Sequence, residues 1–280
     1  MTALLNGEIV NCEPLGKIKK EKLIVGDNVQ LEYNNYSGKY IVTKIFERKN
    51  SLIRPTIANI DQLFLIISKI PKTDYLLIDK LLIYCNQNNI DPYIIVNKVD
   101  LYDIDELQAI RDQYLPCCKD VIMVNAKEGL GINNIIKYLP NKLSAFAGQS
   151  AVGKSTIINQ ICPELKLKTN GLSKKIERGK HTTRHSEIYI TNKNIMITDT
   201  PGFSMLNLDI NIDPATLSHY YPEFDKYRQC RYADCDHTNL LDKDCAVAKA
   251  VNNGNINKLR YDRYVELYKI CNERWRKKYD

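Results

Sequence analysis

The sequence lacks any apolar run long enough to cross a membrane. Uninterrupted runs such as Leu63–Ile67 are far shorter than the about 20 residues that a spanning helix needs. The first residues, MTALLNGEIV, contain neither a basic patch nor a long apolar stretch, so we expect no signal peptide and a reducing, cytoplasmic location. A lipidation motif and an amphipathic anchor are also missing, which argues against a membrane target. The sequence contains no internal repeat and no low-complexity segment. The hydrophobic content of 44% excludes a wholly disordered chain.

The positive charge is unevenly spread along the 280 residues. The net charge is +7 overall, and counting along the sequence places +3 in residues 1–60, −1 in 61–160, +2 in 161–215 and +3 in 216–280. Two basic ends around a neutral middle indicate either a polyanionic partner or ordinary lysine-rich surfaces. Eighteen tyrosines against five phenylalanines suit wet surfaces.

Residues 1–58 read as a small all-β barrel. The apolar or alternating segments Gly7–Asn11, Asn28–Tyr33 and Lys39–Phe46 predict strands, and the glycines at 26 and 38 mark turns between them.

Residues 59–208 alternate between apolar runs and helix-period segments. We expect strands at Leu63–Ser68, Tyr93–Val96, Val121–Asn125, Leu143–Ala147, Ile188–Thr191 and Ile195–Thr198. We expect helices at Tyr75–Gln87, Asp103–Tyr114, Ile132–Tyr138 and Gly153–Gln160. This alternation predicts a parallel sheet with helices on both faces.

Residues 209–280 begin irregularly and end in an amphipathic helix over Ile256–Lys278. The basic run Arg274–Lys278 closes this helix, where it would also favour the helix dipole.

The strongest motif is a phosphate-binding loop that matches G-x-x-x-x-G-K-[ST] between a predicted strand and a predicted helix. It comprises Gly148, Gln149, Ser150, Ala151, Val152, Gly153, Lys154, Ser155 and Thr156. Its backbone N–H groups would surround phosphate oxygens, Lys154 would reach the β- and γ-phosphates, and Ser155 would bind Mg²⁺.

A guanine-reading motif, N-K-x-D, ends the strand Tyr93–Val96 as Asn97, Lys98, Val99 and Asp100. Asp100 can accept hydrogen bonds from N1–H and the exocyclic amine of guanine, which adenine does not offer. Asn125, Ala126 and Lys127 follow the next strand and resemble the S-A-K loop that backs the base, with asparagine in place of serine.

Two further segments could contact Mg²⁺ and the γ-phosphate. Asp199 and Gly202 form a D-x-x-G element after an apolar strand; D-T-P-G alone also reads as a plain turn. Thr182 and Thr183 stand where a switch threonine is expected, and the sequence does not decide between them. Phe203 follows Gly202 where many GTPases carry a water-orienting glutamine, so we expect slow intrinsic turnover. His181 is a candidate to orient the water, or a solvent-exposed loop residue.

The order of these motifs is unusual, because the base-reading loop precedes the phosphate loop. Ordinary GTPases run the other way, so the sequence predicts a circularly permuted domain. The chain then leaves this domain just after the D-x-x-G element, so the C-terminal residues are attached directly to the segment that responds to the γ-phosphate.

Nine cysteines, an odd number, argue for thiols or metal ligands rather than a disulfide frame in a reducing compartment. Cys230, Cys235, His237 and Cys245 can close a tetrahedral Zn²⁺ site, which a small irregular domain needs in place of a large core. Separate thiols remain the alternative, since C-x4-C is less diagnostic than C-x2-C.

Together, these motifs resemble the RsgA (YjeQ/YloQ) family of circularly permuted GTPases, over nearly the whole chain. The resemblance implies a multidomain α/β protein with an N-terminal OB-fold β-barrel that binds RNA (1–58), a permuted P-loop GTPase domain (59–208) and a C-terminal α-helical zinc-binding domain (209–280). It implies one structural Zn²⁺, Mg²⁺ with GTP, and GTP hydrolysis stimulated by the 30S ribosomal subunit late in its maturation, with 16S rRNA as a contact. We expect a monomer. Two departures are the short segment before Gly7 and a His237–Cys245 spacing about two residues longer than usual.

Two other functions stay open from the residues alone. One is a nucleotide-gated RNA-binding protein whose hydrolysis is incidental, and the other is a GTPase that serves another target such as tRNA.

Overall fold

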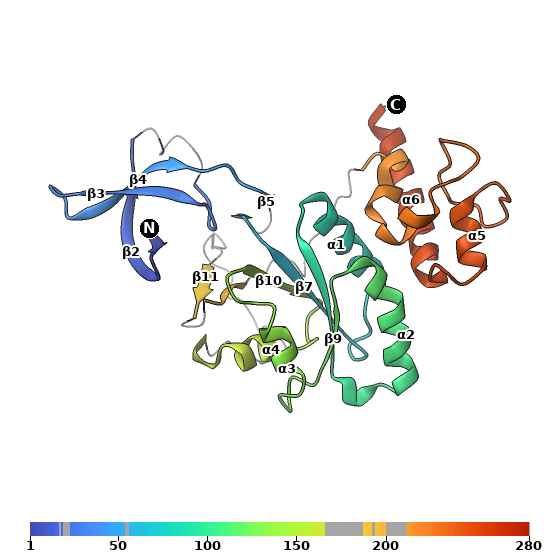
Figure 1. Ribbon diagram of the computed structural model, residues 1–280, viewed down its shortest axis with the longest axis horizontal. Helices are drawn as coiled ribbons and strands as arrows, with labels where there is room; N and C mark the ends of the chain where they lie inside the picture. Colours follow the sequence, from blue (N-terminus) through green and yellow to red (C-terminus); the bar gives the residue numbers. More distant parts are fainter. Residues whose placement is uncertain are drawn as a thin grey trace, which may run out of the picture.

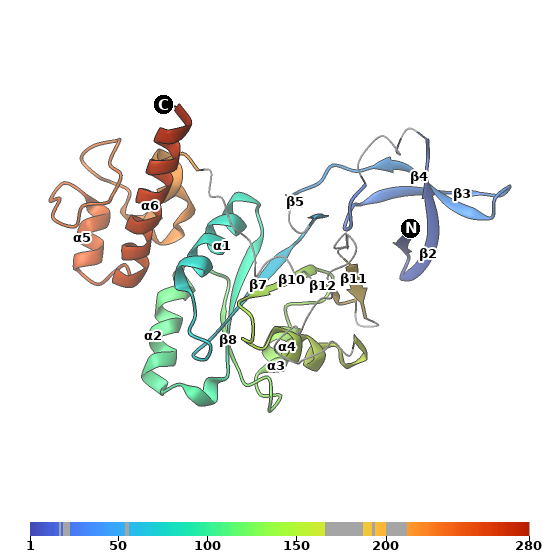
Figure 2. The same ribbon diagram turned by 180° about the vertical axis from the view of Figure 1, so that it is seen from behind.

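The computed structural model describes residues 1–16, 18, 23–53, 56–165, 187–191, 194–199 and 212–279. They form an N-terminal β-region, a central sheet with helices, and a helical C-terminal region (Figure 1). The N-terminal and C-terminal regions lie on opposite sides of the central sheet in both views (Figures 1 and 2). The two basic ends of the sequence are therefore separated by the neutral middle.

The N-terminal region is a four-stranded mixed sheet in the order β1-β2-β4-β3. Its strands are β1 (Thr2–Leu5), β2 (Glu8–Pro14), β3 (Val29–Asn34) and β4 (Lys39–Ile45). Strands β2 and β4 are parallel and the other neighbours are antiparallel. The three predicted strands are confirmed, and β1 is an addition. Within the described residues this sheet is open, with β1 and β3 at its edges, and its buried core is small, consisting of Cys12, Ile18 and Val42.

A two-stranded sheet of β5 (Ser51–Ile53) and β6 (Thr56–Ala58) leads from this region into the central sheet. The central sheet has the order β11-β12-β10-β7-β8-β9, in which only β11 is antiparallel among the described strands. Its strands are β7 (Gln62–Ser68), β8 (Asp91–Asn97), β9 (Val121–Val124), β10 (Leu143–Gly148), β11 (Glu187–Ile190) and β12 (Met196–Asp199). All six predicted strands are confirmed.

Helices cover both faces of the central sheet, as the sequence predicts. Alternate residues of β7 point to opposite faces: Leu63 and Leu65 pack in the core that includes α1 and α2, and Phe64 packs in the core that includes α3 and α4. The helices are α1 (Tyr75–Gln87), α2 (Ile104–Tyr114), α3 (Ile132–Ile136) and α4 (Lys154–Ile161). Phe64 also stacks between Tyr93 and Phe146, with ring centroids 4.9 and 5.0 Å away.

The C-terminal region is built from two 3₁₀ segments, η6 (Pro214–Tyr220) and η7 (Pro222–Tyr227), and two helices, α5 (Ala246–Asn252) and α6 (Lys258–Tyr279). The predicted final helix is confirmed, and it begins after Asn257, whose side chain accepts from the Leu259 N–H. Phe224, Tyr221 and Tyr264 form an aromatic centre, which Ile83 of α1 joins. The core of this region is therefore completed by the central domain.

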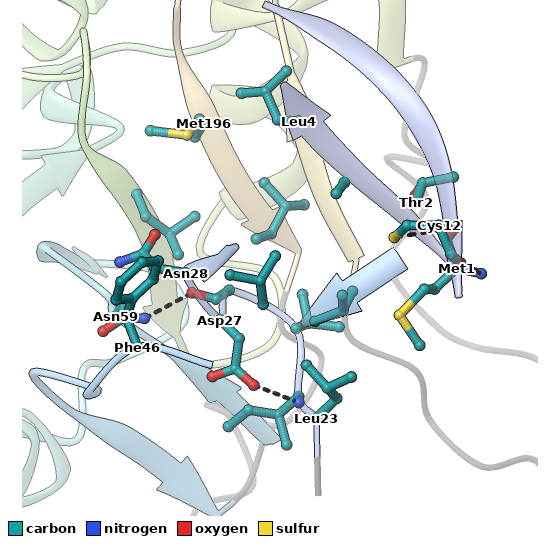
Figure 3. A pocket seen from close by; sticks show the side chains of 18 of the residues that line it. Met1, Thr2, Leu4, Cys12, Leu23, Asp27, Asn28, Phe46, Asn59 and Met196 are labelled. Carbon is teal, nitrogen blue, oxygen red and sulfur yellow. Dashed lines mark hydrogen bonds between the residues drawn. The ribbon is translucent and has the colours of Figure 1, made fainter. Parts of the chain in front are cut away.

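A cleft lies between the N-terminal sheet and the β11–β12 edge of the central sheet (Figure 3). Leu4 of β1 and Met196 of β12 are among the residues that line it, as are Asn59 and Gly26, where Asn59 Nδ2 donates to Gly26 O. None of the predicted phosphate, guanine or metal residues is among its described lining residues. Among the described helices, none has the length and apolar character needed to span a membrane.

Candidate functional site

Three loops meet at the carboxyl ends of the parallel strands. Residues 148–153 follow β10, 97–100 follow β8 and 125–127 follow β9. In parallel sheets of this kind, ligands bind at this edge. The sheet order therefore brings together the phosphate and guanine motifs, which are far apart in the sequence.

The phosphate loop has the backbone expected for curling around an anion. Ala151 and Gly153 adopt left-handed conformations, with φ of 65° and 99°, on either side of the buried Val152. Helix α4 begins at Lys154, and its N-cap Gly153 supplies no side-chain hydrogen bond. The first N–H groups of a helix have no partner within the helix, so they can donate to a ligand, with Lys154 and Ser155 on the first turn beside them.

Asn97 holds the phosphate loop and the third loop in place. Its Nδ2 donates to Val152 O at 2.8 Å, and its Oδ1 accepts from the Ala126 N–H at 3.0 Å. A Cβ atom at Gly153 would collide with Asn97 Nδ2, so this close approach requires glycine. Asn97 is itself only 2% exposed. The predicted guanine-loop asparagine is therefore a brace between two other loops.

Lys98 and Asn125 complete the bracing. Lys98, in a left-handed conformation, donates through Nζ to Ala151 O at 2.9 Å and to Ile70 O at 2.6 Å. Asn125 Nδ2 donates to Asp100 Oδ1 at 2.9 Å, and Asn125 Oδ1 accepts from the Glu128 N–H at 3.3 Å. The asparagine that replaces serine in this motif therefore orients the carboxylate predicted to read guanine, and Asp100 itself is exposed.

The structure describes some of the remaining predicted site residues and not others. Lys127 is exposed beside the guanine loop, and Ser155 and Thr156 are half-buried on α4. Asp199 ends β12, beside β10 and at the same edge as Gly148. His181, Thr182, Thr183, Gly202 and Phe203 lie outside the described residues.

A second cluster, in the C-terminal region, has the geometry of a metal centre. The ligand atoms of Cys230, Cys235, His237 and Cys245 all lie within 4.8 Å of one another. The two Sγ atoms of Cys230 and Cys245 are 3.9 Å apart, and His237 Nδ1 lies 3.4 and 3.5 Å from them. A tetrahedral Zn²⁺ with S at about 2.3 Å and N at about 2.0–2.1 Å would place these atoms about 3.8 and about 3.5 Å apart, so Cys230, His237 and Cys245 fit this ion. Cys235 Sγ lies within 4.8 Å of all three ligand atoms and is available as the fourth ligand.

The surroundings of the cluster favour metal ligation. The Ala246 and Ala248 N–H groups donate to the sulfurs of Cys230 and Cys245, each at 3.3 Å. Burial lowers the pKa of His237 and so favours the neutral imidazole that binds metal. Burial also raises the pKa of Cys245 to about 12, so a bound metal would displace its proton. Tyr261 donates to His237 O at 2.8 Å and fixes the backbone of the loop.

Two features of the site are not visible in the sequence motifs. Gln149 of the phosphate loop accepts from the Asp74 N–H at 2.9 Å, at the start of α1. A buried group of four charged residues also joins α1 to the C-terminal region: Asp79, Glu223, Arg260 and Arg263. The sequence offered only a weak signal for this group, two arginines at i and i+3 on the predicted amphipathic helix Ile256–Lys278, because their partners are distant in the chain.

The fold and the three loops define a P-loop GTPase in which strand β8, with the N-K-x-D motif at its end, precedes β10 and the G-x-x-x-x-G-K-[ST] loop in the chain. Comparison with known proteins agrees: the RsgA GTPase family model matches residues 45–209. The chain belongs to this family.

Named relatives cover most of the chain. The small ribosomal subunit biogenesis GTPase RsgA of Thermotoga maritima is 37% identical over 94% of this chain and 89% of its own length. The protein of the same name from Ruminiclostridium cellulolyticum is 39% identical over 95% and 88%. The crystal structure of YjeQ from Thermotoga maritima superposes with a TM-score of 0.80 at 34% identity, covering 95% of this chain and 91% of that one. YloQ, described as a circularly permuted GTPase, gives 0.77 at 32% identity, covering 95% and 88%. The predicted family and the predicted permutation are confirmed.

Proposed function

We propose that this GTPase acts late in assembly of the 30S ribosomal subunit, in the cytoplasm and as a monomer. In this proposal it contacts 16S rRNA through both ends of the chain, and the subunit stimulates GTP hydrolysis. The observation that carries the proposal is the meeting of the phosphate and guanine loops at one sheet edge, in a chain whose relatives are named as small-subunit biogenesis GTPases.

In the proposed complex, the base lies against residues 97–100 and 125–127. Asp100 accepts from guanine N1–H and the exocyclic amine, while Asn125 holds the carboxylate in place. Replacing Asp100 with asparagine turns one acceptor into a donor, which matches xanthine better than guanine. Asp100→Asn should therefore weaken GDP binding and admit xanthosine diphosphate; unchanged preference for GDP would contradict this assignment.

The phosphates lie in the loop 148–156, with Lys154 near the β- and γ-phosphates. Mg²⁺ that arrives with GTP supplies further positive charge, and Ser155, Asp199 and one of Thr182 and Thr183 would hold it. Gly202 would contact the γ-phosphate through its N–H. Phe203 cannot orient a water molecule, so we expect slow hydrolysis that accelerates when contact with the subunit places His181 beside the reacting water.

The Cys230, Cys235, His237 and Cys245 cluster is proposed to bind one structural Zn²⁺. Its support is the agreement between the observed ligand separations and tetrahedral geometry. The ion would stabilise the stretch between η7 and α5, residues 228–245, in which the structure has no helix or strand.

The two ends of the chain are the proposed rRNA-binding parts. The N-terminal sheet supplies four strands toward a five-stranded OB fold and exposes Tyr33 and Tyr36 on and next to β3, where bases could stack. At the other end, α6 finishes with the basic run Arg274–Lys278.

Co-sedimentation with purified 30S subunits tests the proposal. Binding should be stronger with a non-hydrolysable GTP analogue than with GDP, and single-turnover hydrolysis should accelerate when subunits are added. Equal binding in both nucleotide states would reject a switch. Nucleotide-dependent binding without acceleration would favour a nucleotide-gated RNA-binding protein.

A further inference from the structure

Four charged side chains are buried where the C-terminal region docks on the central domain. Asp79 of α1 is fully buried, Arg260 of α6 is 2% exposed, Glu223 is 8% exposed and Arg263 is 14% exposed. Two positive and two negative charges balance one another. Burying charges is costly unless each is paired, so the arrangement of the two regions that pairs these four charges is favoured over arrangements that separate them.

The contacts centre on Asp79. Arg263 Nε donates to Asp79 Oδ2 at 2.5 Å, and Arg260 Nη1 lies 2.6 Å from Asp79 Oδ1. Arg260 also reaches Glu223 Oε1 through Nη2 at 2.7 Å, and its guanidinium lies over the Tyr221 ring, 4.7 Å from the centroid. The middle of α1 is therefore the anchor for α6.

The N-terminal end of the same helix is tied to the phosphate loop. Gln149 Oε1 accepts from the Asp74 N–H, and Lys98 joins Ala151 O to Ile70 O in the segment just before α1. Asp74 and Asp79 are five residues apart, which corresponds to about 7.5 Å along a helix. The phosphate loop and the buried charges thus contact the same helix about 7.5 Å apart along its axis.

We propose that α1 couples the nucleotide site to the C-terminal region: an ordered phosphate loop favours docking of α6 through Asp79, and docking of α6 favours nucleotide binding. The coupling is reciprocal, because two equilibria that share one element must affect each other equally. This proposal rests on the proposed nucleotide binding. It adds a second connection between the nucleotide site and the C-terminal region, besides the direct chain connection after the D-x-x-G element. An rRNA contact on the C-terminal region would reach the phosphate loop through this helix.

A double-mutant cycle with Gln149→Ala and Arg263→Met tests the coupling in the full-length, zinc-loaded protein. The readout is the dissociation constant and dissociation rate of a fluorescent GDP analogue. Arg263→Met should weaken binding at least about fivefold, mostly through faster dissociation, and Arg263→Lys should restore much of it. In the Gln149→Ala background, the same change should have less than about a twofold effect. Arg231→Met, on an exposed arginine paired with Asp244, is the matched control and should leave affinity unchanged.

The outcomes separate this inference from the proposed function. If the wild-type protein does not bind GDP, the proposed function fails. Suppose that the wild-type protein binds GDP. The coupling is then refuted if Arg263→Met leaves the dissociation constant unchanged, or if the double variant changes it by the product of the two single-variant factors. Should Arg263→Met not fold, hydrogen exchange of the wild type decides: saturating GDP should slow exchange in α6, and unchanged exchange there refutes the proposal.

Discussion

Asn97→Ala should damage both stability and nucleotide binding, and its cost can be worked from two hydrogen bonds. The substitution removes the partner of Val152 O and of the Ala126 N–H, and both of these residues are 1% exposed. An unpaired buried polar group costs about 1–3 kcal/mol, so the free energy of unfolding should fall by about 2–6 kcal/mol. Because the loops must also be reordered when the ligand binds, the dissociation constant for GDP should rise by at least about tenfold.

Asn50→Ala is the matched control for this prediction. Asn50 is buried and makes two similar bonds, to Ile60 O at 2.8 Å and from the Ile60 N–H at 2.9 Å, together with a third to Asn88 O at 3.2 Å, away from the three loops. Chemical denaturation should show a comparable loss of stability, whereas titration with a fluorescent GDP analogue should show less than about a twofold change. The bracing argument is refuted if Asn97→Ala binds GDP as the wild type does, or if both variants weaken GDP equally.

Three further changes test other parts of the site. Gly153→Ala should abolish GDP binding in a fluorescence titration, since a Cβ would meet Asn97 Nδ2 and φ is 99°; retained binding would mean that the loop adapts. Cys235→Ser should remove the bound metal as measured by atomic absorption, and calorimetry of zinc binding to metal-free wild type should detect released protons, because burial raises the pKa of both Cys235 and Cys245. His181→Ala should reduce subunit-stimulated hydrolysis by about 10²-fold or more without changing GDP affinity; intact stimulated turnover would remove His181 from the mechanism.

The central sheet could be predicted from the sequence because the signals for its strands come from residues that are close together in the chain. The alternation of residues 63–67 between two faces and the motifs at strand ends depend on neighbours in the chain. The predicted start of one helix differed by a residue from the observed one because Asp103 caps the helix and does not belong to it. Helix α2 begins after Asp103, whose side chain forms a capping box with Glu106. Strand β1 was missed because its short run, TALL, shows no turn before it and no clear alternation.

The buried charges could not be predicted because they depend on pairing over long separations. Arg263 and Asp79 are 184 residues apart in the chain. In the sequence, a lone aspartate on an apolar helix and arginines on another are each compatible with solvent exposure. Only the docking of α6 on α1 brings them together, and the orientation of Asp100 by Asn125 likewise depends on the distance between two loops.

The position of β7 in the middle of the sheet has a consequence for synthesis of the chain. Its two neighbours, β8 and β10, pair with it on opposite edges, and β10 is encoded far later, with Ser144 opposite Gln62. At ordinary elongation rates, β10 emerges roughly 4–16 s after β7. During that interval one edge of a fully buried strand has no partner from its own sheet, and such edges invite pairing with other chains. In the permuted order, the nascent protein therefore needs another partner for this edge of β7 until β10 is made. In the usual order β10 is made before β7, so this edge of β7 can pair as soon as it is synthesised.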